Sequence, residues 1–181
     1  MYWKHFPLFL LVALASPLFA QEAVPPRPSP VAIVSYKYKD SYLKIVYGQP
    51  HKKGREVFGK LVPYGQVWRL GANEATELTI SREVFIDSHL LPAGTYAVFA
   101  IPEKDKWTII FNSDLGQWGS FNYNPAKDVL RIERATQMLP GELVYEPFTI
   151  AIDPKNNKAD IVLTWDKTTV SFGVDFIEPK P

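Results

Sequence analysis

Three carboxylates next to two aromatic loops are the side chains of this chain best suited to catalysis: Glu74, Glu77 and Asp114. Two acidic groups suffice for glycoside hydrolysis when one has a raised pKa and the other stays ionised. Glu74, acting with Glu77 or with Asp114, is therefore a candidate for a carboxylate-dependent hydrolase. The plainer interpretation of Glu74, which we favour, is a structural ion pair or a turn hydrogen bond with Arg69 or Asn73.

The same loops carry residues suited to binding a small polar molecule. Aromatic rings offer flat faces to a sugar, and amides or charged groups bond its hydroxyls. The candidate ligand-binding residues are Tyr64, Trp68, Arg69, Asn73, Glu74, Gln117, Trp118, Asn122 and Tyr123. Five basic residues against one acid between Gly48 and Leu70 would suit an anionic ligand. Alternatively, the aromatic rings close the ends of the fold and the lysines are solvated.

Other kinds of chemistry find little support in the composition. The chain has no cysteine, which excludes disulfides, thiol nucleophiles and thiolate-bound metals. His51 and His89 are not spaced as a ligand pair, so we expect no metal site and no cofactor. Ser120 follows Gly119 without the pattern of a nucleophile elbow, which disfavours a serine hydrolase. Phosphate-binding glycine motifs are missing as well.

The charge balance limits the class of partner. Twenty basic residues oppose nineteen acidic ones, for a net charge of +1. Such a balance argues against a nucleic-acid partner. No apolar stretch after the first twenty residues is long enough to span a membrane. We therefore expect the partner to be a small molecule or a glycan, and the oligomeric state stays open.

β-Strands must position these candidate residues, because hydrophobic side chains recur with period two. The clearest runs are Tyr42–Tyr47, Glu77–Ile80, Thr95–Ile101, Trp107–Asn112, Phe148–Asp153, Ala159–Asp166 and Val170–Phe176. With the turns between them they predict an all-β fold, an antiparallel, jelly-roll-like β-sandwich of about ten or eleven strands with little helix. The candidate residues lie mainly in two stretches that break the alternation, Gly48–Thr76 and Asn112–Tyr123, and such misfits are where function is expected.

The amino-terminal part of the chain predicts export. Lys4 precedes the apolar run Phe6–Ala15, and a small residue, Ala20, ends the segment, which is typical of a signal peptide over residues 1–20. Residues 21–30 contain four prolines and form a stiff tether. Residues 31–181 are expected to form one β-sandwich domain. The protein would then be soluble and periplasmic or extracellular.

Several motifs of the chain are shared with a known family. They are Val62–Arg69, Gly71–Thr76, Leu91–Tyr96, Trp107–Asn112 and Gly116–Gly119. Together they resemble the signature of the Domain of Unknown Function 2911 family over nearly all of Val31–Phe176. Leu70 stands where the family has threonine, so no role for a hydroxyl is carried over there. The resemblance implies an exported bacterial domain of unestablished activity and supplies no catalytic residues.

Three functional hypotheses follow for the segments Trp68–Glu74 and Gln117–Tyr123, which we expect to meet in one polar and aromatic site. The first is non-catalytic binding of a small polar or glycan-like ligand. The second is the carboxylate-dependent hydrolase. The third is a structural module of a cell-envelope complex, which the proline-rich tether would suit.

Overall fold

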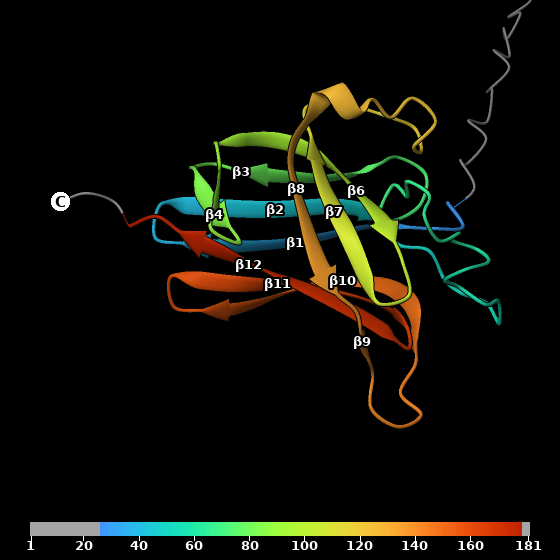
Figure 1. Ribbon diagram of the computed structural model, residues 1–181. Helices are drawn as coiled ribbons and strands as arrows, with labels where there is room; N and C mark the ends of the chain where they lie inside the picture. Colours follow the sequence, from blue (N-terminus) through green and yellow to red (C-terminus); the bar gives the residue numbers. More distant parts are fainter. Residues whose placement is uncertain (1–25, 179–181) are drawn as a thin grey trace, which may run out of the picture.

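The computed structural model describes residues 26–178, and these form two antiparallel sheets packed face to face (Figure 1). The described residues contain twelve strands and one short 3-10 helix. The strands are β1 (Val31–Tyr38), β2 (Ser41–Gly48), β3 (Thr76–Ile80), β4 (Val84–Ile86), β5 (His89–Leu91), β6 (Gly94–Pro102), β7 (Lys106–Asn112), β8 (Asp128–Ala135), β9 (Gln137–Met138), β10 (Tyr145–Lys155), β11 (Lys158–Asp166) and β12 (Thr168–Phe176), and the helix is η1 (Pro125–Lys127).

The first sheet has the strand order β1-β2-β3-β6-β7-β8, and the second has β10-β11-β12-β4-β5 with β9 paired to β12. The expected antiparallel β-sandwich is therefore confirmed. The described residues contain more strands than expected because β9 has two residues and β4 and β5 have three each. Strands this short are too brief to show an alternation in sequence.

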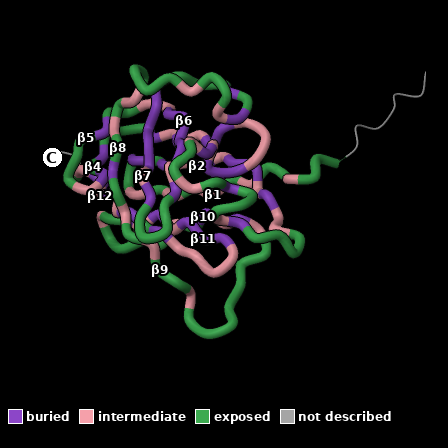
Figure 2. Tube along the Cα trace, turned by 45° about the vertical axis from the view of Figure 1, so that its right-hand side comes forward, coloured by how far each residue is buried: buried purple, intermediate pink, exposed green. Residues whose placement is uncertain are grey.

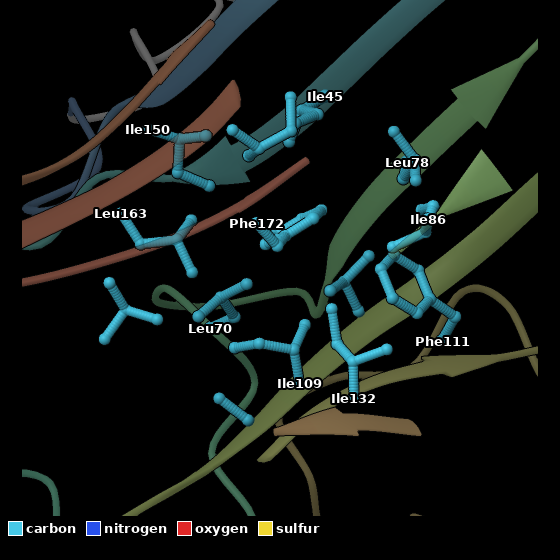
Figure 3. Packing of buried hydrophobic residues seen from close by; sticks show 14 of the residues in the cluster. Ile45, Leu70, Leu78, Ile86, Ile109, Phe111, Ile132, Ile150, Leu163 and Phe172 are labelled. Atoms are coloured by element: carbon cyan, nitrogen blue, oxygen red, sulfur yellow. The ribbon is translucent and has the colours of Figure 1, made fainter. Parts of the chain in front are cut away.

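The period-two pattern correctly identified the core. In β12, Val170, Phe172, Val174 and Phe176 are all buried, and the residues between them are more exposed. The equivalent residues of β2, β7, β10 and β11 meet them between the two sheets (Figure 3). This apolar layer is the main source of stability, because the described chain has no disulfide.

A second, smaller core covers part of the outer face of the first sheet. Ala97, Phe99 and Ile110 are fully buried there, with Val67 and Tyr123 packed against them. As a result β7 is buried along most of its length (Figure 2), although its sequence alternates like a half-buried strand. The cover comes from the two irregular stretches, so these are packed against the sheet.

The described chain begins with the last part of the proline-rich segment, which leads into β1. The predicted signal peptide, residues 1–20, lies outside the described residues. Within residues 26–178, no helix is both long and apolar enough to cross a bilayer.

Candidate functional site

The two irregular stretches meet through backbone hydrogen bonds. The N–H of Gly119 donates to the carbonyl of Asn73 at 2.9 Å. Glu74 and Trp118 form an isolated antiparallel bridge one residue further on. Residues directly opposite in such a bridge project their side chains to the same side. The chain therefore places the Glu74 carboxylate and the Trp118 ring as neighbours.

A close approach of two backbones holds the first of these loops in place. The N–H of Ala72 donates to the carbonyl of Gly48, at the end of β2, at 3.1 Å. A Cβ atom added to Gly48 would lie only 2.0 Å from the carbonyl oxygen of Ala72. Only glycine allows this approach, so Gly48 fixes the course of the loop.

A cleft of about 350 Å³ opens beside the bridge, and we call it the acidic cleft. Glu74 and Glu77 both line it, together with Gly116 from the second loop and Arg27 from the proline-rich segment. Oε1 of Glu77 accepts a long hydrogen bond of 3.3 Å from the N–H of Gly116. Asp114 is exposed and is not among the lining residues. The cleft therefore contains two of the three candidate carboxylates.

Arg27 is the ion-pair partner of Glu74. Its Nη1 donates to both carboxylate oxygens at 2.8 Å, and both side chains are about half exposed. A hydrogen bond from the backbone of Glu74 itself and the one from Arg27 hold the pKa of Glu74 below its usual value. The ion pair favoured from sequence exists, but its partner is neither Arg69 nor Asn73.

Trp68 does not offer an open face. Residue 68 pairs with Ala100 of β6 through two backbone hydrogen bonds, of 2.7 and 2.8 Å, which turns the ring toward the interior. Only 8% of the residue is exposed, and the ring stacks on Trp165 at 5.9 Å between centroids. Its Nε1 donates to the carbonyl of Gly71 at 3.0 Å. The structure thus corrects the expectation of a stacking platform, because this ring belongs to the core.

Trp118, by contrast, is 57% exposed. Its neighbour Gln117 is only 7% exposed, with Nε2 donating to the carbonyl of Asp114 at 2.9 Å. The Oε1 atom of Gln117 is buried with no hydrogen-bond partner among the described residues. Gln117 therefore supports its own loop, and Trp118 is the ring available to a ligand.

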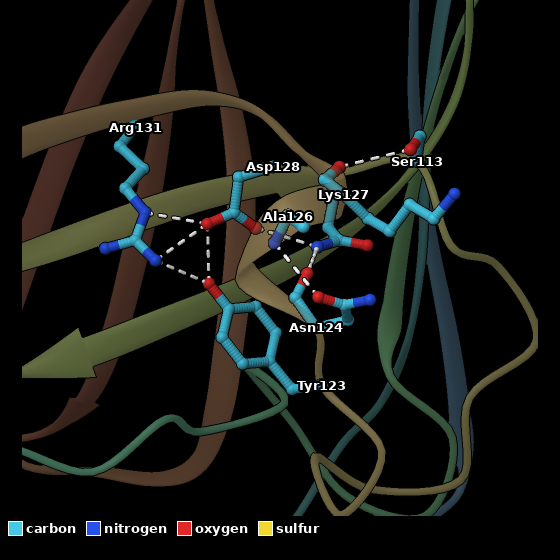
Figure 4. Close-up of polar contacts among 8 residues, drawn as sticks. Ser113, Tyr123, Asn124, Ala126, Lys127, Asp128 and Arg131 are labelled. Atoms are coloured by element: carbon cyan, nitrogen blue, oxygen red, sulfur yellow. Dashed lines mark hydrogen bonds and ion pairs between the residues drawn. The ribbon is translucent and has the colours of Figure 1, made fainter.

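Tyr123 belongs to a polar network at the start of β8 (Figure 4). Its hydroxyl donates to Oδ2 of Asp128 at 2.6 Å and accepts from Nη2 of Arg131 at 2.7 Å. Asn112, fully buried, donates to the other oxygen of Asp128 at 2.7 Å. Desolvation, and then the hydrogen bond to Asp128, raise the pKa of Tyr123 to about 12. The hydroxyl is thus engaged in holding the loop.

The other predicted ligand residues are dispersed. Asn73 has φ +64° and donates from Nδ2 to the carbonyl of Ser29 at 3.1 Å, which binds the loop to the proline-rich segment. Asn122 is exposed, and Tyr64 is half-buried against Gly59. None of these three lines the acidic cleft.

Arg69, next to Trp68 in the chain, is partly buried. Its Nη1 donates to the carbonyl of Asn73 at 3.0 Å, and burial lowers the pKa of the guanidinium. Gly119 packs against it, since a Cβ there would lie 3.2 Å from Nη1. Arg69 therefore connects the two loops.

Arg27 and Ser29 were missed by sequence reasoning, because nothing in a proline-rich tether indicates that it folds back onto a loop about fifty residues later. Of the two histidines considered as metal ligands, His89 has Nδ1 2.9 Å from the carbonyl of Asp87, and His51 pairs through its backbone with Pro147. Residues 26–178 contain no group of three or more metal-ligating side chains.

Comparisons with known proteins place the chain in a family. No curated protein and no solved structure matches it significantly. One family model, described as a protein of unknown function (DUF2911), matches residues 29–174, which is most of the chain and includes both loops of the acidic cleft. The resemblance in the motifs around Trp68 and Trp118 is thereby confirmed, and the chain belongs to the DUF2911 family.

Proposed function

We propose that this protein binds a small polar ligand of the glycan class at the acidic cleft, without transforming it. One observation carries the proposal: the exposed Trp118 lies directly opposite Glu74 in a backbone bridge, and Glu74 lines a cleft of about 350 Å³. A cleft of this size is within the range of small-ligand sites.

The chemistry of the pair suits a sugar. Trp118 supplies a large flat apolar face, on which the C–H face of a pyranose can stack. The carboxylates of Glu74 and Glu77 accept hydrogen bonds from hydroxyl groups, and bonds to a charged acceptor are stronger than neutral ones. The guanidinium of Arg27 adds donors at the same place. The cleft supplies acceptors and donors, and Trp118, bridged to Glu74 outside the cleft lining, supplies the apolar face that specific sugar binding needs.

The electrostatics argue against Glu74 as a general acid. A general acid needs a raised pKa, whereas the pKa of Glu74 is lowered by hydrogen bonds from its own backbone and from Arg27. Glu74 therefore remains ionised at neutral pH. An ionised, hydrogen-bonded carboxylate suits recognition of hydroxyls.

A carboxylate-dependent hydrolase remains the second candidate, because Glu74 and Glu77 line the same cleft. In that case the lowered pKa of Glu74 would assign it to the ionised role, as nucleophile or base, and Glu77 would have to act as the acid. Asp114, outside the cleft lining, has no part in this version.

Calorimetric titration with a panel of soluble oligosaccharides tests the proposal. Replacing Trp118 by alanine should weaken the binding of any sugar that binds by about tenfold or more, since burial of a large apolar side chain against the ligand contributes roughly 1.5–3 kcal/mol. Tyr42→Ala is the matched control, because Tyr42 is an exposed ring at the other end of β2. Equal losses in both variants, or no binding across the panel, would contradict a site at Trp118.

Glu74→Gln separates binding from hydrolysis. For a binding protein the variant should bind more weakly, and neither protein should release reducing sugar. For a hydrolase, the wild type should release reducing sugar and the variant should lose that activity while retaining affinity. Measurable turnover that depends on Glu74 would replace the first proposal by the second.

A further inference from the structure

The arginines of this chain divide into two groups. All six lie within residues 26–178, and four have a carboxylate partner: Arg27 with Glu74, Arg82 with Asp40, Arg131 with Asp128 and Arg134 with Asp87. Arg55 and Arg69 have no carboxylate within ion-pair distance in the described part of the chain. These two line the same cavity.

The cavity has a volume of about 220 Å³, and we call it the arginine groove. Its apolar wall includes the exposed Leu61 and the small exposed parts of Val62, Trp68 and Trp165, and none of its lining residues is acidic. A second cavity of about 150 Å³ adjoins it and shares Arg69, Trp68 and Val62 with it. Two arginines without a carboxylate partner therefore line one cavity together with an exposed aliphatic side chain.

Arg69 is held in place by main-chain atoms. Its Nη1 donates to the carbonyl of Asn73, and the guanidinium packs against Gly119, as described above. Partial burial of a guanidinium without a counter-charge costs free energy, and the lowered pKa of Arg69 has the same cause. An anion bound in the groove would remove this cost.

Arg55 is likewise oriented by carbonyl groups. Its Nε donates to the carbonyl of Lys52 at 2.8 Å, and its Nη2 donates to that of His51 at 2.6 Å. Lys52 itself is neutralised by Asp166 at 2.5 Å, so its charge is not available to a ligand. Arg55 thus keeps a fixed direction while its charge has no acidic partner.

We propose that the arginine groove binds a small organic oxyanion, a carboxylate or phosphate group attached to an apolar body. Guanidinium groups bind both kinds of oxyanion through paired hydrogen bonds. The exposed side chain of Leu61, which lines both cavities, would contact the apolar body. This site is separate from the acidic cleft and does not depend on the function proposed there.

An NMR titration of the ¹⁵N-labelled protein at low salt tests this inference. The probes are benzoate, phenyl phosphate and inorganic phosphate. Benzoate or phenyl phosphate should give saturable shifts at the groove, and the comparison of the two shows which oxyanion is preferred. Inorganic phosphate should bind about tenfold more weakly than phenyl phosphate, because it lacks the apolar body. Binding should weaken as salt is added.

Arg69→Gln and Arg55→Gln should each weaken the binding of the better probe by about tenfold or more, since each removes charge-assisted hydrogen bonds. Arg82→Gln is the matched control, because Arg82 is an exposed arginine that pairs with Asp40. Glu74→Gln should leave the affinity unchanged, which keeps the result independent of the acidic cleft.

Three outcomes would overturn the proposal. One is that neither organic probe gives saturable shifts up to about 10 mM. The dissociation constant would then exceed about 10 mM, which is too weak for a specific site. Another is an equal loss in Arg82→Gln and Arg55→Gln. The third is equal affinity for inorganic phosphate and phenyl phosphate. If Arg69→Gln does not fold, the affinity of Arg55→Gln still tests the proposal, because Arg55 is exposed.

Discussion

The acidic cleft and the arginine groove are both lined by residues of one chain segment, 69–75, and carry opposite charge. In the acidic cleft, Arg27 balances Glu74 from within the protein. In the arginine groove, Arg55 and Arg69 are balanced by no acid of the described chain. The first site keeps one carboxylate, Glu77, without an ion pair among the described residues, whereas the second has two such arginines, whose charge a bound anion would balance. The same segment can therefore present two chemically different surfaces.

The largest expected effect comes from the support that both sites share. Gly48→Ala would place a Cβ atom against the carbonyl of Ala72, so it should lower the free energy of unfolding by about 3 kcal/mol or more. Urea denaturation measures the change. Gly54→Ala is the matched control: it has φ +71° but no atom within 4 Å of the added Cβ, so only about 1 kcal/mol of backbone strain is expected. Similar losses in both variants would show that the close approach is unimportant.

Two glycines of the second loop should separate the two sites. Gly119 and Gly116 have φ of +75° and +70°, so alanine at either should cost about 1 kcal/mol in backbone strain, and at Gly119 the ring of Phe121, 2.8 Å from the added Cβ, must also shift. The added Cβ of Gly119→Ala also meets Arg69, which should weaken oxyanion binding. Gly116→Ala, at the edge of the acidic cleft, should spare oxyanion binding and alter that cleft instead. NMR titration of both variants with phenyl phosphate checks this, and an equal effect would mean that the sites are not independent.

The loop that carries Trp118 should also respond to alkaline pH. Because the pKa of Tyr123 is raised from 10.0 to about 12 in the folded protein, its contribution to stability is complete below about pH 10 and is lost as the pH rises toward 12. Thermal unfolding of the wild type and of Tyr123→Phe from pH 8 to pH 12 measures it. The difference between the two proteins should shrink with rising pH; a constant difference would contradict the role of the hydroxyl.

The smallest expected effect on stability comes from removing the ion pair between Arg27 and Glu74. Arg27→Gln should change stability by less than about 1 kcal/mol, because the pair is exposed. The pKa of Glu74, measured by NMR titration, should rise toward its usual value when Arg27 is removed. The pair should also weaken in acid, as the pH falls through the lowered pKa of Glu74. An unchanged pKa would mean that the backbone hydrogen bond alone sets it.

Sequence reasoning predicted the sandwich and its core well, because burial of one face repeats every two residues. Val170 to Phe176 show this directly. The site was harder, since a loop has no period. We expected the ring of Trp68 to be exposed for ligand stacking. Its direction is set by the backbone bridge to Ala100, a residue that is distant in the sequence and is brought near by the fold. Trp118 has the same residue type and faces outward.

Ion pairs between residues far apart in the sequence could not be predicted either. Arg27 and Glu74 are 47 residues apart, and no local pattern joins them. The basic character of the segment before Leu70 was recognised, but Lys52 is neutralised while Arg55 and Arg69 are not. Differences of a few ångströms in the folded structure decide which of these basic side chains has an acidic partner, and the sequence does not contain those distances.

The position of the proline-rich segment has a practical consequence for attaching this protein to a surface. Arg27 lies in the acidic cleft, whereas Glu178, the last described residue, bonds to Tyr38 and Lys39 at the far end of β1. The eight residues of β1 separate the two ends by roughly 25 Å. An affinity tag or a sensor chip joined through the carboxyl end would therefore leave the cleft open, and one joined next to residue 26 would crowd it.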